Sequence, residues 1–294
     1  MTKLQFSITL LTLSLISSFN SIQSATFTLT NQCTYPVWTG LLSGAGTPPL
    51  PTTGFPLESS QSNSISIPPN WSGRIWGRTL CSTDSSGKFT CVTGDCGSGT
   101  VECNGGGAAP PATLAEFTLN GANGLDFYDV SLVDGYNLPM MVVPQGEGSG
   151  GNCNVTGCVA DLNENCPLEL RLTGSNDGDK SVACRSACEA FGDPMYCCSG
   201  AYSTPQTCNP SSYSKYFKTA CPTAYSYAYD DGTSTFTCSS ANYVITFCPT
   251  PVTSRKTTGG GNQSAEISGS GSLANAFGVS VVTVIIALML TYVC

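Results

Sequence analysis

Three closely spaced cysteines are the first residues in this sequence whose type and spacing could do chemistry. The stretch CVTGDC spans residues 91–96, and Cys103 follows it in a run rich in glycine. Cysteines at such spacing could bind zinc, form a redox pair or belong to a framework of disulfides. These interpretations predict different functions, so the rest of the chain has to distinguish among them.

The cysteine and histidine content narrows the choice. The chain has 17 cysteines, of which one, Cys294, is the last residue and all the others lie between Cys33 and Cys248. There is no histidine, which excludes Ser-His-Asp and Cys-His nucleophilic catalysis and leaves an all-cysteine site as the remaining form of zinc binding. We expect neither a metal nor any other cofactor.

The start of the chain indicates where these cysteines fold. Lys3, an apolar run from Leu4 to about Phe19 and small polar residues up to Ser24 form the pattern of a secretory signal peptide over residues 1–24. A buried N-terminal helix is the alternative. A domain that begins at Ala25 would fold in an oxidising compartment, where its even set of cysteines predicts eight disulfides.

Charge excludes one class of partner. Between Ala25 and Pro251 there are 18 acidic residues against 8 basic ones, which leaves a formal net charge of −10. Binding to nucleic acid needs clustered positive charge, so we expect no nucleic-acid partner. Net charge keeps secreted proteins apart in solution, and we expect a monomer.

The composition changes after Cys248. Residues 251–272 are rich in Gly, Ser and Thr, which predicts a flexible linker, and residues 273–294 form an apolar segment without charge. The segment fits a transmembrane helix or a glycosylphosphatidylinositol signal. No basic residue follows it, which favours the lipid anchor. Attachment is then expected at Ser268, with Ser270 as the alternative, and Cys294 would be removed with the signal.

The elements that must position any site are predicted to be mostly β-strands. Period-two alternation predicts strands at 25–31, 113–121 and 125–135, and a hairpin over residues 235–249 that turns around Ser239–Asn242. Regularly spaced short strands favour a β-sandwich or barrel.

One helix and a loop-rich lobe complete the predicted organisation. The helix is expected over residues 181–191, where Cys184 and Cys188 would share a face. The stretch from Cys158 to Cys221 holds eight cysteines and little alternation, which predicts a lobe stapled by disulfides. Three sequons predict surface N-glycosylation, at Asn70, Asn154 and Asn262.

Several segments together resemble the thaumatin-like family of plant pathogenesis-related proteins. GKFTCVTGDC, with the glycines and Cys103 that follow, resembles the family's signature. It is joined by SGRIWGRTLC (72–81), PPATLAEFTLN (110–120), GLDFYDVSLVDGYNLPM (124–140), GCVADLNENCP (157–167), PMYCCSGAY (194–202) and CPTAYSYAYDDGTSTFTC (221–238). The resemblance covers residues 25–250. It implies a mainly β fold: a thaumatin-like β-sandwich core, a disulfide-stapled lobe at about 158–222 and a small looped subdomain at about 80–112.

The same resemblance implies that the cysteines between 91 and 103 form disulfides, rather than a zinc site or a redox pair. The family's pattern implies eight disulfides: Cys33–Cys248, Cys81–Cys91, Cys96–Cys103, Cys153–Cys238, Cys158–Cys221, Cys166–Cys184, Cys188–Cys197 and Cys198–Cys208. CVTGDC would then contribute to two short loops, with Cys91 paired backward and Cys96 paired forward.

The resemblance also implies an acidic cleft between the core and the stapled lobe. By motif, its residues fall on Arg74, Glu116, Asp129, Asp134 and Asp231, with Asp230 as the alternative to Asp231. Residues 129 and 134 would face opposite sides of a straight strand, so Asp134 must leave the strand, and Asp134-Gly135 is a turn pair.

Such a cleft suits a sugar chain. Clustered carboxyls repel one another, which should raise some of their pKa values. Carboxylates accept hydrogen bonds from hydroxyls, and Phe127 and Tyr136 could stack on sugar rings. We therefore expect a defence-related protein on the extracellular face of the plasma membrane, held by its lipid anchor. Its cleft would bind β-1,3-glucan-type polysaccharide with weak or no hydrolysis.

Three other functions stay open at this point. An active endo-β-1,3-glucanase would use Glu116 as proton donor and Asp134 as nucleophile or base, because a pair of carboxyl groups is the minimal machinery of glycoside hydrolysis. An antifungal protein would permeabilise fungal membranes. A wall-localised interaction or inhibitor protein would bind another protein.

Overall fold

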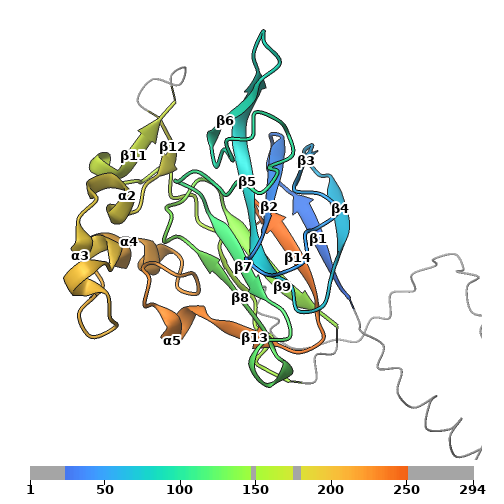
Figure 1. Cartoon of the computed structure of the whole chain (residues 1–294). Coiled ribbons are helices and arrows are strands. Elements are labelled where there is room, and N and C mark those ends of the chain that lie inside the picture. Colours follow the sequence, from blue (N-terminus) through green and yellow to red (C-terminus); the bar gives the residue numbers. More distant parts are fainter. Residues whose placement is uncertain (1–23, 147–149, 175–179, 251–294) are drawn as a thin grey trace, which may run out of the picture. The chain divides into compact units, whose positions relative to one another are not determined.

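The computed structural model describes residues 24–146, 150–174 and 180–250 (Figure 1). Residues 1–23 and 251–294 lie outside this description, and with them most of the predicted signal peptide, the linker, the apolar segment and the residues Asn262, Ser268 and Ser270. Within the described ranges, no helix is long and apolar enough to cross a membrane.

Two β-sheets form the core of the described domain (Figure 1). The five-stranded sheet has the order β10 (Thr156–Cys158), β9 (Met140–Gln145), β14 (Asn242–Phe247), β1 (Ala25–Asn31), β4 (Ser62–Ile67). The seven-stranded sheet has the order β13 (Phe236–Cys238), β8 (Asp126–Ser131), β7 (Leu114–Thr118), β5 (Ser72–Thr83), β2 (Val37–Ser43), β3 (Gly54–Leu57), and β6 (Phe89–Thr93) pairs with β5 outside this path. The predicted mainly β fold with a sandwich core is confirmed.

Alternation along the strands explains why the two sheets pack together. In β1, Phe27 and Leu29 are fully buried. Thr28, between them, faces the other side, where its Oγ1 lies 2.9 Å from Ser64 Oγ of β4. Phe27 meets Phe117 of the other sheet with ring centroids 4.5 Å apart. Burial of each such side chain stabilises the folded state by about 1.5–3 kcal/mol. This packing holds the seven-stranded sheet, which carries the site, against the five-stranded sheet.

A loop-rich lobe lies beside the seven-stranded sheet (Figure 1). Its elements are a 3-10 helix at Leu168–Leu170, β11 (Arg171–Thr173), β12 (Ser181–Cys184), α2 (Ala187–Phe191), α3 (Pro194–Cys197), a 3-10 helix at Gly200–Tyr202 and α4 (Ser212–Ala220). Two more short helices precede strands of the core, at Ala122–Gly124 and at α5 (Asp231–Ser234). Helices this short are not stable alone, so covalent links and side-chain contacts must hold the lobe.

The described cysteines are all paired, in eight disulfides. The pairs are the ones that the family resemblance implies: Cys33–Cys248, Cys81–Cys91, Cys96–Cys103, Cys153–Cys238, Cys158–Cys221, Cys166–Cys184, Cys188–Cys197 and Cys198–Cys208. The stretch CVTGDC therefore belongs to a disulfide framework.

The helix predicted over residues 181–191 is wrong in its first half. Ser181–Cys184 is strand β12, and α2 begins at Ala187. Cys184 exchanges two backbone hydrogen bonds with Tyr136, at 2.7 and 2.8 Å. Ser186 then caps α2 by accepting a hydrogen bond from the backbone N–H of Glu189 at 3.2 Å. β12 pairs with β11 in a two-stranded sheet, and the bridge from Cys184 to Tyr136 is a contact distant in the sequence. Local periodicity reveals neither pairing, and Cys184 and Cys188 do not share a helix face.

The hairpin predicted over residues 235–249 is also wrong. β13 pairs with β8 in the seven-stranded sheet, whereas β14 pairs with β1 and β9 in the five-stranded sheet. The residues between them carry the chain from one sheet to the other. Phe236 of β13 and Tyr243 of β14 both lie in the core, each on a different sheet.

Candidate functional site

Three neighbouring strands carry the first three predicted cleft residues in a row. Arg74 of β5 is directly opposite Glu116 of β7, and Glu116 is directly opposite Asp129 of β8. Successive side chains of a strand face opposite sides, so Glu116 points outward while Ala115 and Phe117 are buried in the core. The register of the sheet therefore sets the order guanidinium, carboxyl, carboxyl across its outer face.

An ion pair joins the first two members of this row. Nε of Arg74 lies 2.7 Å from Oε1 of Glu116, and the two side chains are 52% and 30% exposed. The pKa of Glu116 is nevertheless raised, because burial outweighs the opposing effect of Arg74 and the charge of Asp134 adds to the rise. Glu116 is thus a partly desolvated carboxyl with a cation as its partner.

Asp129 has no such partner. Its Oδ2 atom is buried and takes part in no hydrogen bond. Burial, followed by the negative charge of Glu116, raises the pKa of Asp129 to about 8, and Arg74 opposes this rise only in part. The expected increase of pKa in the clustered carboxyls is confirmed for this residue, with burial rather than repulsion as the main cause.

Asp134 reaches the cleft from a turn, as predicted. β8 ends at Ser131, and the backbone N–H of Gly135 closes the turn by donating to the Leu132 carbonyl at 3.0 Å. Gly135 has a φ of +84°, and a Cβ there would lie 2.7 Å from a side-chain atom of Pro111. Position 135, directly after Asp134, therefore requires glycine, both for its backbone conformation and because a side chain there would clash.

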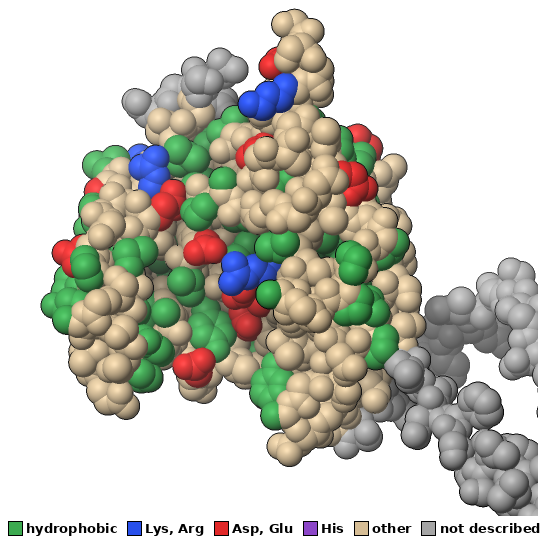
Figure 2. All heavy atoms as spheres, in the orientation of Figure 1, with side chains coloured by type: hydrophobic (Ala, Val, Ile, Leu, Met, Phe, Trp, Pro, Cys, Tyr) green, Lys and Arg blue, Asp and Glu red, His purple; other side chains and the backbone are tan. Residues whose placement is uncertain are grey.

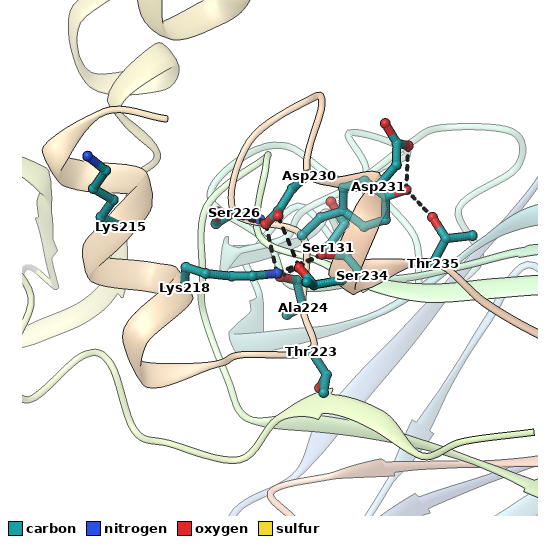
Figure 3. Close-up of polar contacts among 12 residues, drawn as sticks. Ser131, Lys215, Lys218, Thr223, Ala224, Ser226, Asp230, Asp231, Ser234 and Thr235 are labelled. Atoms are coloured by element: carbon teal, nitrogen blue, oxygen red, sulfur yellow. Dashed lines mark hydrogen bonds and ion pairs between the residues drawn. The ribbon is translucent and has the colours of Figure 1, made fainter. Parts of the chain in front are cut away.

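Asp231, the fifth residue, lies at the start of α5. Its carboxylate is exposed and accepts a hydrogen bond from the Tyr225 hydroxyl at 2.8 Å. The same hydroxyl contacts Thr235 Oγ1 (Figure 3). Burial and the bond to Asp231 contribute to a raised pKa of Tyr225, so this phenol stays protonated as a donor.

The neighbouring Asp230 has a structural role instead. It forms an ion pair with Nζ of Lys218 at 2.9 Å and accepts hydrogen bonds from the backbone N–H and the hydroxyl of Ser226 at 3.0 and 2.9 Å. Nζ of Lys218 also donates to the Ala224 carbonyl and to Ser234 Oγ, at 3.1 and 2.8 Å (Figure 3). This network fixes the segment that carries Tyr225 and Asp231, and it occupies Asp230 away from the cleft.

The five predicted residues line one depression of about 320 Å³. The residues that complete its lining are Leu114, Ser131, Val133, Tyr225 and Ala228. A second depression, of about 460 Å³, shares Arg74, Glu116 and Asp129 with the first and extends to Phe127 and the loop at Gly44. Figure 2 shows acidic and basic side chains gathered in this hollow between the core and the lobe. The two depressions together form the acidic cleft.

Sequence reasoning misplaced one aromatic residue and missed one acid. Tyr136 is fully buried and donates its hydroxyl to the Ala160 carbonyl at 2.9 Å, so it cannot stack on a ligand. Glu189 of α2 was not predicted, although its i,i+4 spacing to Arg185 is a readable signal; the two side chains lie 3.5 Å apart. Burial raises the pKa of Glu189 to about 7, and the charge of Asp134 adds to the effect.

Two predictions remain, on glycosylation and on metal binding. Asn70 and Asn154 are exposed, and their glycosylation stays a prediction. Among residues 24–146, 150–174 and 180–250, no three acidic, cysteine or histidine side chains are grouped so as to hold a metal ion.

Comparison with known proteins gives consistent matches over most of the chain. A model of the thaumatin family matches residues 31–249. Thaumatin-like protein 1 of Arabidopsis thaliana is 58% identical over 231 residues, which cover 76% of this chain and 86% of that protein. A protein of Prunus avium named glucan endo-1,3-beta-glucosidase is 55% identical over 244 residues, which cover 82% of this chain and 98% of that protein.

A third relative is longer than this chain. The PR5-like receptor kinase of Arabidopsis thaliana is 52% identical over 266 residues, which cover 88% of this chain but 40% of that protein. The chain thus spans less than half the length of that relative.

Proposed function

The chain belongs to the thaumatin family, and from this premise we propose that it is an extracellular, defence-related protein whose acidic cleft binds β-1,3-glucan-type polysaccharide. The observation that carries the proposal is the convergence of Arg74, Glu116, Asp129, Asp134 and Asp231 on one depression. These residues come from three strands, a turn and a short helix, and an acidic face that served solubility alone would not need them in one hollow.

The chemistry of the cleft favours a neutral polysaccharide. Carboxylates repel anionic polymers and accept charge-assisted hydrogen bonds from hydroxyl groups. Arg74 supplies a donor beside them, and Phe127, which lines the adjoining depression, offers an apolar ring face. Because the two depressions share three residues, they form an extended site that suits a chain of sugars better than a single ring.

The test is a pair of isosteric substitutions. Glu116→Gln and Asp134→Asn keep the shape of the side chain but remove its charge. Each should weaken binding of a β-1,3-glucan oligomer about three- to thirtyfold, measured by calorimetry, because a charge-assisted hydrogen bond is about twice as strong as a neutral one. Glu164→Gln, at an exposed carboxylate that does not line the cleft, is the control.

Two results would count against this proposal. If the wild type binds the oligomer and neither cleft variant weakens binding, the ligand site lies elsewhere. If the wild type binds no glucan, a function as an interaction or inhibitor protein takes precedence.

A second candidate function is active endo-β-1,3-glucanase, which the name of the Prunus avium relative favours. Two carboxyl groups on either side of a glycosidic bond can protonate the leaving oxygen and attack or activate water. Glu116 and Asp134 are the candidates, since the charge of Asp134 acts on Glu116. Release of reducing ends from a β-1,3-glucan, lost in both isosteric variants and kept in Glu164→Gln, would establish hydrolysis.

The position of the protein at the cell surface is also a proposal. The linker at 251–272 and the apolar segment at 273–294 support attachment to the outer face of the plasma membrane through a lipid anchor at Ser268 or Ser270. Phospholipase C specific for phosphatidylinositol should release the protein from membranes. Retention, with peptides from residues 280–294 detected in the mature protein by mass spectrometry, would identify a transmembrane segment instead.

A further inference from the structure

We propose that Asp129 is uncharged in the folded cleft at neutral pH and serves there as a hydrogen-bond donor. The cleft would then recognise its ligand through a row of donor, acceptor and donor on β5, β7 and β8. This inference rests on the proposed glucan-binding function of the same cleft, and it concerns the protonation and role of a single residue.

The geometry of the row gives the first argument. The three side chains lie directly opposite one another, yet the guanidinium of Arg74 is bonded to Glu116 at 2.7 Å. Asp129, one strand further on, forms no ion pair with Arg74, whose charge offsets the rise in its pKa only in part. Its Oδ2 atom is buried without a hydrogen bond. A buried carboxylate oxygen that receives no donor carries the full cost of desolvation, and losing the charge removes most of that cost.

The surroundings of Asp129 give the second argument. The charged and titratable groups that act on it or share its depression are Arg74 of β5, Glu116 of β7, Asp134 of the turn after β8, Tyr225 of the loop after α4 and Asp231 of α5. One cation stands against three carboxyl groups, and the phenol is neutral. A second negative charge beside Glu116 is therefore disfavoured, in agreement with the pKa of about 8 for Asp129.

A protonated Asp129 changes what the cleft can recognise. Neighbouring strands lie about 4.8 Å apart, so the row offers a guanidinium donor, a carboxylate acceptor and a carboxylic-acid donor at regular steps. The acid can donate to a ring, glycosidic or hydroxyl oxygen of a neutral sugar. If the cleft hydrolyses glucan, this residue holds a proton beside the ligand more readily than Glu116 does, because Glu116 is paired with Arg74.

Binding of a β-1,3-glucan oligomer across pH is the first test. Affinity of the purified, processed wild type should hold up to about pH 7 and fall about tenfold by about pH 9, as the donor is lost. Asp129→Asn, whose amide is a permanent donor, should stay within about threefold of wild type at low pH and lose this decline. Asp129→Ala should bind weakly at every pH, and Glu164→Gln should behave as wild type.

The opposite pattern would overturn the inference. If Asp129 acts as a charged acceptor, Asp129→Asn should lower affinity about tenfold at every pH, and the wild type should keep its affinity at about pH 9.

A second test does not depend on glucan. Carbon NMR of the Asp129 carboxyl should show a titration midpoint near pH 8 in the wild type, and a midpoint near pH 4 would refute the inference whatever the protein binds. Absence of glucan binding combined with a midpoint near 8 would reject the proposed ligand but support the protonated Asp129.

The dependence of stability on pH is a third test of the protonation of Asp129, and its direction can be predicted. The ordinary pKa of an aspartate is 3.8, and that of Asp129 in the folded cleft is about 8. Between these two pH values, the folded state holds a proton that the unfolded chain has released. The contribution is complete below about pH 4 and is lost as pH rises to about 8, by up to tenfold in the folding equilibrium constant per pH unit. Asp129→Asn should remove this slope, and an unchanged slope in that variant would contradict the proposal.

Discussion

The two walls of the cleft are built in different ways. The sheet wall consists of Arg74, Glu116 and Asp129, which three antiparallel strands place opposite one another. The loop wall consists of Asp134, Tyr225 and Asp231, which lie on a turn, a loop and a four-residue helix. Backbone hydrogen bonds of the sheet fix the first wall. The second depends on disulfides and on the side-chain network around Lys218 (Figure 3).

This difference implies a different sensitivity to substitution. Side chains on the outer face of a sheet can change without loss of register, provided that the core face stays apolar. A loop held by a few side chains loses its position when one of them is removed. Stability and cleft geometry should therefore depend mainly on residues behind the loop wall, and changes of ligand chemistry should come mainly from the sheet wall.

The largest effect is expected from removing the disulfide behind the loop wall. Cys158–Cys221 links β10 to the end of α4, immediately before the segment that carries Tyr225, and closes a stretch of 63 residues. Replacing both cysteines by alanine should lower the free energy of unfolding by about 4 kcal/mol on the chain-entropy model and weaken glucan binding. Denaturant unfolding and calorimetry measure the two effects.

Cys81–Cys91 is the matched control for that variant. It closes a stretch of 10 residues where β5 pairs with β6, so its removal should cost about 2–3 kcal/mol. Binding should be unaffected, because neither cysteine lines the cleft. Equal loss of binding in the two double variants would mean that the loop wall has no special dependence on its own disulfide.

The next effect in size is expected from Lys218→Met. The side chains of Lys218 and Asp230 are 25% and 13% exposed, and the substitution leaves Asp230 desolvated without its cation. Breaking a buried pair costs about 3–5 kcal/mol, which we reduce to about 2–3 for this partial exposure. Lys215→Met is the control. Lys215 is an exposed lysine on the same helix that points away from the network, and its substitution should change stability by at most about 0.5 kcal/mol (Figure 3).

The difference between the two walls also explains which parts of the cleft could be predicted from the sequence. Alternation in residues 113–121 places Glu116 outward with no knowledge of the fold, and the turn pair after β8 predicts that Asp134 leaves the strand. The family resemblance supplied the cysteine pairing, because spacing alone left it open. Strand register, which brings Arg74 and Asp129 beside Glu116, is a long-range property that local patterns do not contain.

The loop wall was harder to predict for a physical reason. Asp230 and Asp231 are adjacent and chemically identical, and the choice between them depends on where Lys218 and Ser226 lie. The strand at Ser181–Cys184 likewise requires its backbone partners, β11 and, at Cys184, Tyr136. The burial of Tyr136, which removes it as a stacking residue, also depends on long-range contacts, in the core and with the Ala160 carbonyl.

A smaller effect is expected at the edge of the loop wall. Tyr225→Phe removes the hydroxyl that donates to Asp231 and contacts Thr235, while the ring is kept. The loss of this hydroxyl, whose bond to Asp231 is exposed, should lower the free energy of unfolding by about 1 kcal/mol. Glucan affinity should fall as well if the position of Asp231 matters for binding. A stability change without any change in affinity would remove Asp231 from the proposed ligand contacts.

The smallest effect on stability is expected for Arg74→Met, although it removes the ion pair of the sheet wall. Arg74 is half exposed, and exposed pairs contribute about 0–1 kcal/mol, so the free energy of unfolding should change by about 0.5 kcal/mol or less. The electrostatic effect should be larger, because Arg74 lowers the pKa of both Glu116 and Asp129. Without the cation, both values should rise and the decline of glucan affinity at alkaline pH should shift upward. A loss of stability as large as that of Lys218→Met would mean that the sheet wall depends on its side chains as much as the loop wall does.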